Sequence, residues 1–195
     1  SDVCSSDLLM LEKIISIDKK LLIYLNSLGS ESFDPFWLLI TKQVVWLPFF
    51  ALVFFVLYKK LGRINFFYAI GVLALLILVC DQSANLFKHS FRRLRPCNDL
   101  EIKSIIRVVK ESSSFSFYSG HATNSMATTL FVFFVLKKYY KYAALLFFFP
   151  LIFAYSRIYL GLHFPGDVLT GYLFGALYGY IAYCLFNKYV LQSRV

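Results

Sequence analysis

The sequence predicts an all-α fold, a polytopic bundle of transmembrane helices. Hydrophobic residues make up 59% of the 195 positions, and the mean hydropathy is +0.65. These residues are gathered in runs longer than the core of a soluble domain requires. Five runs approach or exceed the roughly 20 residues with which a helix crosses a bilayer. The predicted spans are Phe36–Tyr58, Ile64–Phe87, Tyr118–Leu136, Tyr142–Tyr159 and Pro165–Phe186.

The N-terminal segment has a different pattern from the five runs. Leu8–Leu28 mixes Leu and Ile with charged residues, among them Glu12, Asp18 and Lys19. Such mixing is typical of an amphipathic helix that lies in the membrane interface. We therefore divide the chain into residues 1–33, a tail with this interfacial helix, and residues 34–195, a single transmembrane domain with an outer loop at about 89–117.

The net charge of +9 is unevenly distributed along the chain. The connections Tyr58–Arg63 and Lys137–Lys141 and the tail Asn187–Val195 together hold eight Lys or Arg and no Asp or Glu. By the positive-inside rule these segments are cytoplasmic, which places the 89–117 loop and the N-terminus outside. A nucleic-acid partner is excluded, because the chain has no soluble basic domain and no platform of aromatic and basic residues.

Three polar clusters share the outer face when the direction of successive spans alternates. Charged residues at membrane depth are costly, and they are retained where they line a site, pair with one another or bind a charged substrate. A common face for all three clusters therefore indicates a functional site. The clusters are Lys88 to Pro96, Ser119 to His121, and Arg157 to Asp167.

Each cluster contains groups that suit a phosphate. Lys88 supplies a compact point charge, while Arg95 and Arg157 carry planar forks that match phosphoryl oxygens. Ser119 and Gly120 lie at the expected start of the third span, where free backbone N–H groups and the helix dipole attract anions. Taken singly, a cation near a helix end also fits a snorkelling anchor at the membrane interface.

His163, Asp167 and His121 are the candidate catalytic residues. His163 and Asp167 are four residues apart, and Pro165 is placed to open the last helix, so that Asp167 can hold one imidazole nitrogen. The other nitrogen is then free to attack phosphorus, and His121 can protonate the departing oxygen. The alternatives are a polar helix start for His121 and a local capping pair for His163 and Asp167.

The remaining polar residues have structural interpretations. We expect the polar residues of the second span, Asp81, Gln82, Ser83 and Asn85, to form interhelical hydrogen bonds. The four cysteines have no zinc-ligand spacing, and we expect neither a metal nor a cofactor. The loop cations are expected to be solvated near anionic headgroups. They are Arg92, Arg93, Lys103, Arg107 and Lys110.

The three clusters resemble the motifs of the type 2 phosphatidic acid phosphatase family of membrane lipid phosphatases. The family's Lys-x6-Arg-Pro motif is found from Lys88 to Pro96, and its Ser-Arg-x5-His-x3-Asp motif from Ser156 to Asp167. Its Pro-Ser-Gly-His motif is found with Tyr118 in place of the proline. A lone Ser-Gly-His is weak evidence, but three ordered motifs at these spacings are specific.

The resemblance implies a helical membrane bundle that hydrolyses a lipid phosphate without metal, through a phosphohistidine intermediate. Carried over by motif, His163 is the nucleophile, Asp167 its orienting partner and His121 the acid for the leaving group. The phosphate-binding residues carried over are Lys88, Arg95, Ser119, Gly120 and Arg157.

The chain is similar to small bacterial family members that act on undecaprenyl diphosphate, which is the preferred substrate from the sequence. The same likeness implies the bacterial cytoplasmic (inner) membrane, with the site facing outside, and a lipid substrate and membrane lipids as partners. Phosphatidylglycerophosphate, phosphatidate and the 1-phosphate of lipid A stay open as substrates. Phosphoryl transfer to another lipid and a non-catalytic anionic-lipid binder or transporter also stay open, as does the oligomeric state.

Overall fold

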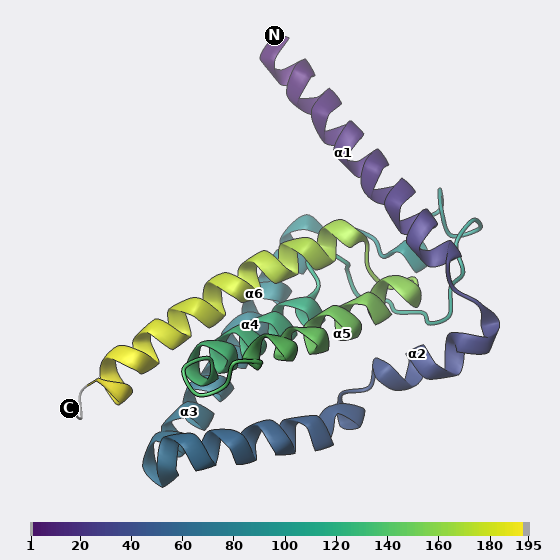
Figure 1. Ribbon diagram of the computed structural model, residues 1–195. Helices are drawn as coiled ribbons and strands as arrows, with labels where there is room; N and C mark the ends of the chain where they lie inside the picture. The colour runs from purple at the N-terminus through teal and green to yellow at the C-terminus, as the bar shows by residue number, and fades with distance from the viewer. Residues whose placement is uncertain (1, 193–195) are drawn as a thin grey trace.

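The computed structural model describes the backbone of residues 2–192 and the side chains of residues 7 and 9–192; Ser1 and residues 193–195, with Arg194 of the basic tail, lie outside the described residues. Every regular element in the described chain is helical, which confirms the all-α class (Figure 1). The main helices are α1 (Asp2–Ser27), α2 (Asp34–Ile40), α3 (Leu47–Phe91), α4 (Gly120–Leu136), α5 (Phe148–Tyr159) and α6 (Pro165–Phe186). Short 3₁₀ helices are Glu31–Phe33, Gln43–Trp46, Pro96–Asn98 and Ala143–Phe147, and a π-helical turn, Asn187–Leu191, follows α6.

The first predicted span, Phe36–Tyr58, is not one continuous helix. The chain leaves α2 after Ile40, and Lys42 is extended, with φ −81° and ψ 125°. The Trp46 indole N–H donates across the break to the Ile40 carbonyl at 2.9 Å. Pro48 then lies in the first turn of α3, where its missing N–H costs nothing. The apolar run is therefore divided by a backbone break that hydropathy alone does not reveal.

The first and second predicted spans are joined by a turn at a single residue. Gly62 has φ 70° and ψ 169°, while residues 47–61 and 63–91 on either side are helical. A positive φ of this kind is accessible to glycine and strained for other residues. Figure 1 shows the result, in which the first part of α3 runs along one edge of the molecule and the second part turns back behind α4.

Helices α4 and α6 pack backbone against backbone. A Cβ added to Gly171, Gly175 or Gly179 of α6 would lie 2.7, 2.5 and 2.5 Å from carbonyl oxygens of α4 and of Ser119, the residue that caps it. Glycines four residues apart form one stripe along a helix, and such stripes let apolar helices approach closely in membranes. This close contact fixes the start of α6 beside the start of α4.

The outer surface of the helices fits a membrane protein. Two helical stretches are long and apolar enough to cross a bilayer, Gln43–Asn98 and Pro165–Leu191, and Ala143–Tyr159 is a shorter apolar stretch. The first of these includes the turn at Gly62 and thus comprises two apolar helices in sequence. The number of five spans stays a prediction.

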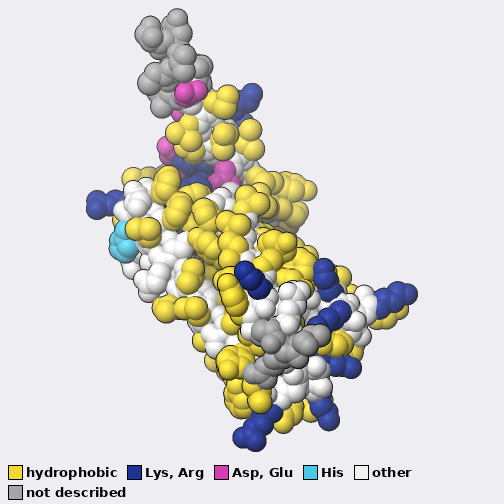
Figure 2. Space-filling model, turned by 90° about the vertical axis from the view of Figure 1, so that its left-hand side faces the viewer, with side chains coloured by type: hydrophobic (Ala, Val, Ile, Leu, Met, Phe, Trp, Pro, Cys, Tyr) yellow, Lys and Arg dark blue, Asp and Glu magenta, His cyan; other side chains and the backbone are white. Residues whose placement is uncertain are grey.

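Helix α1 projects from the bundle and is attached near its C-terminal end (Figures 1 and 2). Leu22 and Asn26 are buried there, and the Asn26 amide bonds the backbone of Arg107 and Tyr159. Apolar side chains farther up the helix, such as Leu9 and Ile14, are exposed. The predicted helical segment is present, and its position in the membrane interface stays a prediction, as does the division of the chain near residue 33.

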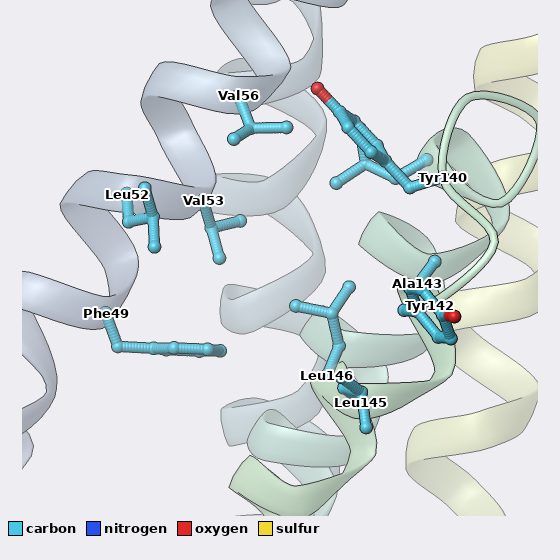
Figure 3. Close-up of a pocket in the computed structure, with 10 residues that line it drawn as sticks. Phe49, Leu52, Val53, Val56, Tyr140, Tyr142, Ala143, Leu145 and Leu146 are labelled. Carbon is cyan, nitrogen blue, oxygen red and sulfur yellow. The ribbon is translucent and has the colours of Figure 1, made fainter.

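An apolar groove of about 300 Å³ opens between the first part of α3 and the 3₁₀ helix Ala143–Phe147 (Figure 3). Phe49, Leu52, Val56 and Leu146 are among its lining residues. The groove lies at the end of α4 that carries Leu136, opposite to the end that carries Ser119. It is therefore remote from the polar clusters predicted to form the site.

Candidate active site

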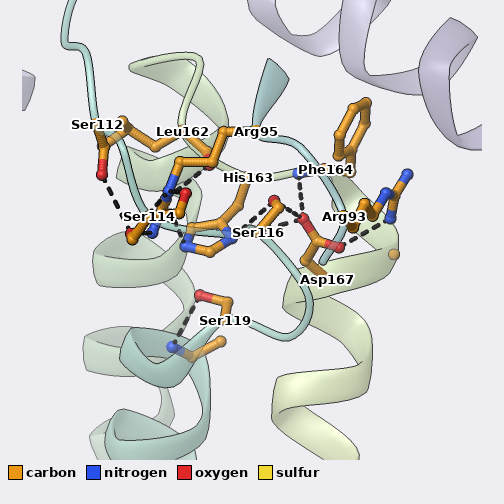
Figure 4. Close-up of polar contacts among 12 residues, drawn as sticks. Arg93, Arg95, Ser112, Ser114, Ser116, Ser119, Leu162, His163, Phe164 and Asp167 are labelled. Carbon is orange, nitrogen blue, oxygen red and sulfur yellow. Dashed lines mark hydrogen bonds and ion pairs between the residues drawn. The ribbon is translucent and has the colours of Figure 1, made fainter. Parts of the chain in front are cut away.

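The three polar clusters meet at the end of the bundle where α4 and α6 begin and α5 ends (Figure 4). The backbone N–H of Ser119 donates to the Asp167 carbonyl at 3.1 Å, which joins the starts of α4 and α6. The Lys88 ammonium at the end of α3 lies 3.9 Å from the place that a Cβ on Gly120 would occupy. The Arg157 carbonyl accepts the N–H of His163 at 3.3 Å. The predicted residues thus form one site.

His163 lies in the loop between α5 and α6 with 1% of its surface exposed. The Arg95 Nη1 is 3.0 Å from its Nε2. Because a guanidinium can only donate, Nε2 is the acceptor here and the proton of the neutral ring is on Nδ1. Burial lowers the pKa of His163 from 6.5 to about 4, and the contact with Asp167 opposes this effect only in part. Nε2 therefore has the lone pair that a nucleophile needs.

Ser116 connects His163 to Asp167. The direct distance from His163 Nδ1 to Asp167 Oδ2 is 3.5 Å, which is long for a hydrogen bond. The Ser116 hydroxyl lies 3.3 Å from Nδ1 and donates a short hydrogen bond to the same Asp167 oxygen. The Ser116 hydroxyl thus bridges the Asp167 carboxylate and the His163 imidazole. Ser116 is not part of the sequence motifs.

Asp167 is fully buried, and both of its carboxylate oxygens have partners. Arg93 donates to Oδ1 at 2.8 Å, and the backbone N–H of Phe164 donates to Oδ2 at 2.9 Å. Arg93 was expected to be solvated, and this ion pair shows that expectation to be wrong. A buried carboxylate with several donors remains charged and fixed in orientation.

Arg95 is also held by the protein. Its Nε donates to the Ser114 carbonyl at 2.9 Å, its Nη2 to the Ser114 hydroxyl at 2.9 Å, and its Nη1 to the Leu162 carbonyl at 2.8 Å. Only 5% of its surface is exposed. The sequence could not reveal Ser114 as a partner, because it lies in an irregular loop without periodicity.

Three other predicted residues carry polar groups without a partner in the described part of the chain. Lys88 and His121 make no hydrogen bond or ion pair there, and the ring of His121 packs on Phe153 with centroids 5.4 Å apart. Arg157 donates to the Thr41 hydroxyl through Nη1, while its buried Nε has no acceptor. The unpaired groups are close enough to interact electrostatically. A cluster of unpaired donors of this kind can bind an anion.

The start of α4 is capped by Ser119 and held against α3 and α6 by Tyr118. The Ser119 hydroxyl accepts the N–H of Ala122 at 3.4 Å as a helix cap. Tyr118, which replaces the family's proline, is buried, and its hydroxyl is 2.6 Å from that of Ser83. Its ring stacks on Phe174 at 4.9 Å. The substitution therefore leaves α4 beginning at Gly120 and ties it to α3 and α6.

Residues 65–190 match the PAP2 superfamily. The chain belongs to this superfamily. Every predicted site residue lies within the matched range, and the PAP2 match confirms the resemblance drawn from the three motifs.

The chain is similar to named PAP2 relatives over most of its length. It is 30% identical over 184 residues to a lipid A 4'-phosphatase of Bacteroides thetaiotaomicron, covering 92% of this chain and 81% of the relative. It is 24% identical over 143 residues to an undecaprenyl-diphosphatase of Sulfolobus acidocaldarius, covering 72% of this chain and 63% of the relative. These likenesses identify a membrane lipid phosphatase of the PAP2 type.

The fold is shared with a solved structure. The transmembrane PAP2 type phosphatidylglycerolphosphate phosphatase of Bacillus subtilis superposes with a TM-score of 0.70 at 20% identity, covering 91% of this chain and 88% of that one. At this identity the likeness concerns the fold, and it supports the helical membrane architecture described above.

Proposed function

We propose that His163 is the nucleophile of a metal-independent lipid phosphatase, and that the phosphoryl group passes through His163 Nε2 to water. In the first step Nε2 attacks phosphorus and the bond from phosphorus to the lipid oxygen breaks. His121 donates the proton that the departing oxygen needs. In the second step His121 accepts a proton from water, which attacks the phosphohistidine and releases inorganic phosphate.

The phosphate is held by the cations around His163. Lys88 and the Nε of Arg157 are unpaired in the described chain, and the backbone N–H of Gly120 lies at the start of a helix. These groups and the hydroxyl of Ser119, which accepts from Ala122 but has its own proton, can donate to phosphoryl oxygens. Arg95 Nη1 contacts the lone pair of Nε2. Phosphate oxygens would take over donors of Arg95, since a charged acceptor competes well with a neutral imidazole, and this exchange would free Nε2 for attack.

The leading substrate is the 4'-phosphate of lipid A. The observation that carries this proposal is the 30% identity, over 92% of the chain, to a relative of that activity. Undecaprenyl diphosphate, the substrate preferred from the sequence, is the second candidate, supported by a relative that is 24% identical over 72% of the chain. Both are phosphorylated lipids whose apolar chains suit the exposed apolar helices.

Release of inorganic phosphate by the purified, detergent-solubilised protein tests this function. Lipid A phosphorylated at the 4' position, undecaprenyl diphosphate, phosphatidylglycerophosphate and phosphatidate are supplied separately in EDTA. Release from all lipids alike would remove the substrate preference, and loss of activity in EDTA would contradict a metal-independent reaction. Phosphate that appears on a second lipid instead of in solution would identify a transferase, and folded protein without turnover would favour a lipid binder.

We further propose that the protein lies in the bacterial inner membrane and that its site faces the periplasmic or extracytoplasmic side. Figure 2 supports this orientation, since Lys and Arg gather at the lower end of the molecule and Asp and Glu near α1 at the upper end. Impermeant maleimide labelling of whole cells can test it with single cysteines placed at Glu111 in the 89–117 loop and at Lys138, both exposed. In a protein whose native cysteines are replaced by Ser, only E111C should react; labelling of K138C alone would reverse the orientation.

A further inference from the structure

An ion-pair chain links helix α1 to the carboxylate beside His163. Arg93 places its two terminal nitrogens on different carboxylates, with Nη1 2.8 Å from Asp167 Oδ1 and Nη2 2.7 Å from Asp18 Oδ2. Its guanidinium also lies 3.8 Å from the centre of the Phe164 ring. Because the fork and one face of the guanidinium are already engaged, Arg93 is not a free phosphate ligand.

Asp18 is bonded to the same helix that carries Asp167. Its Oδ1 accepts the backbone N–H of Gly166, in the first turn of α6, at 2.7 Å. A Cβ on Gly166 would lie 2.8 Å from Asp18 Oδ2, so that the absence of a side chain permits this approach. Only 12% of the Asp18 side chain is exposed. One carboxylate on α1 thus binds both Arg93 and the N-terminal end of α6.

The two oxygens of Asp167 have separate partners as a consequence. Arg93 holds Oδ1, while Ser116, the Phe164 N–H and His163 share Oδ2. Without Arg93 the carboxylate would lose its only guanidinium partner in the described chain, and its orientation would depend on the contacts of Oδ2 alone. The alignment of His163 Nδ1 depends on Oδ2, and so it depends indirectly on Asp18 and Arg93.

We propose that Asp18 and Arg93 are positioning residues that orient Asp167 and, through it, the nucleophile His163. The proposal rests on the proposed role of His163 and holds for any of the candidate lipids. Asp18 lies outside residues 65–190, the range matched to the superfamily. Through Asp18, helix α1 would thus help to position the nucleophile, although it lies outside the matched range.

Kinetics of four variants test the proposal with a lipid that the parent protein hydrolyses. Arg93→Gln removes the charged donor and should lower kcat about tenfold with KM unchanged within about twofold. Arg93→Lys keeps the charge without the fork and should restore part of the loss. Asp18→Asn and Gly166→Ala should each lower kcat about threefold, the latter because its methyl group displaces the Asp18 carboxylate.

Lys19→Gln is the matched control. Lys19 is the neighbour of Asp18 on α1, and its ammonium bridges Asp99 and Glu101 at 2.9 and 2.7 Å. The variant loosens the same helix at the same place without touching Asp167 or Arg93, and its kcat should change less than about twofold. If Arg93→Gln raised KM and left kcat unchanged, the positioning role would be wrong. An equal loss of kcat in Lys19→Gln would also overturn it.

A second readout is independent of turnover. The chain has three histidines, so nitrogen NMR of protein labelled in histidine resolves few imidazoles, and His163→Ala identifies the signal. In the parent, His163 should be neutral with its proton on Nδ1. Loss of the Arg93 charge leaves Asp167 less compensated, so the His163 pKa should rise in Arg93→Gln and stay unchanged in Lys19→Gln. Unchanged His163 signals in Arg93→Gln would refute the proposal even if no lipid were hydrolysed.

Discussion

The two halves of the site differ in how fully their polar groups are bonded. On the nucleophile side, His163, Asp167 and Arg95 are buried, and each is hydrogen-bonded to the protein. On the side proposed to bind phosphate, Lys88, His121 and the Nε of Arg157 have no hydrogen-bond or ion-pair partner in the described chain. The proposed nucleophile is thus held by the protein itself, and the other half keeps donors that can bind an anion. Activity and stability should therefore respond differently to substitutions in the two halves.

The largest expected effect is that of His163→Ala. Turnover should fall by at least about a thousandfold, because His163 is the proposed acceptor of the phosphoryl group. Phosphate release and acid-labile phosphoprotein are the measurements. His89→Ala is the control, since His89 is exposed near the end of α3 and lies outside the site. Full turnover in His163→Ala would eliminate the proposed nucleophile.

Lys88→Met separates the two halves. It removes an unpaired cation that is close to Arg95 and Arg157, and activity should fall about a hundredfold while thermal stability is maintained or raised. Asp167→Asn should lower both activity and thermal stability, because it leaves Arg93 without its buried partner. Phosphate release and thermal unfolding in detergent measure the difference. Equal losses of stability in the two variants would contradict the contrast between the halves.

Ser116→Ala should lower kcat about tenfold, since the 3.5 Å gap between His163 and Asp167 then has no bridging hydroxyl. Ser112→Ala is a suitable comparison, because Ser112 lies in the same loop and its hydroxyl contacts only that of Ser114. The measurement is kcat at saturating substrate. If both variants retain full kcat, the carboxylate acts on the imidazole without Ser116.

Protonation of His163 should affect the activity little near neutrality. With a pKa of about 4, His163 is neutral at pH 6 to 8, so its protonation should lower the activity only as the pH approaches 4. Since the pKa in the folded protein is below its ordinary value, the unfolded chain binds the proton more readily. The contribution of His163 to stability is thus complete above pH 6.5 and declines as the pH falls toward 4. An acid limb near pH 6.5 would indicate a more exposed histidine.

The smallest effect is expected for Tyr118→Phe. It removes the hydroxyl that bonds Ser83 and keeps the ring that stacks on Phe174, so stability should fall by about 1 kcal/mol. Activity should change less than about threefold, because the backbone at Ser119 is unaltered. A large loss of activity would show that the Tyr118 hydroxyl contributes to the site.

The sequence was most informative where chemistry and periodicity coincide. The fifth predicted span has the same bounds as α6, because Pro165 opens it and the apolar run is uninterrupted. The alternating direction of the spans also predicted that the clusters of Arg95 and His163 would lie on one face, and the spacing of four residues paired His163 with Asp167. The three motifs could not reveal Ser116 or Arg93, whose contacts depend on how the irregular loop folds. Likewise, the break at Lys42 lies within an apolar run and depends on local backbone geometry.

The glycine stripe between α4 and α6 has a consequence for how the protein can respond to membranes of different thickness. Helices adjust to a thicker or thinner bilayer by tilting, at a modest cost for each ångström of mismatch. Gly171, Gly175 and Gly179 leave no side chain between α6 and α4, so these two helices can tilt only together. The first part of α3 turns at Gly62 and contacts α5 through side chains, such as Phe49 and Phe50 on Phe149, without a glycine stripe of this kind. We therefore expect variation in bilayer thickness to be absorbed by this part, away from the two helix ends that carry Ser119 and Asp167.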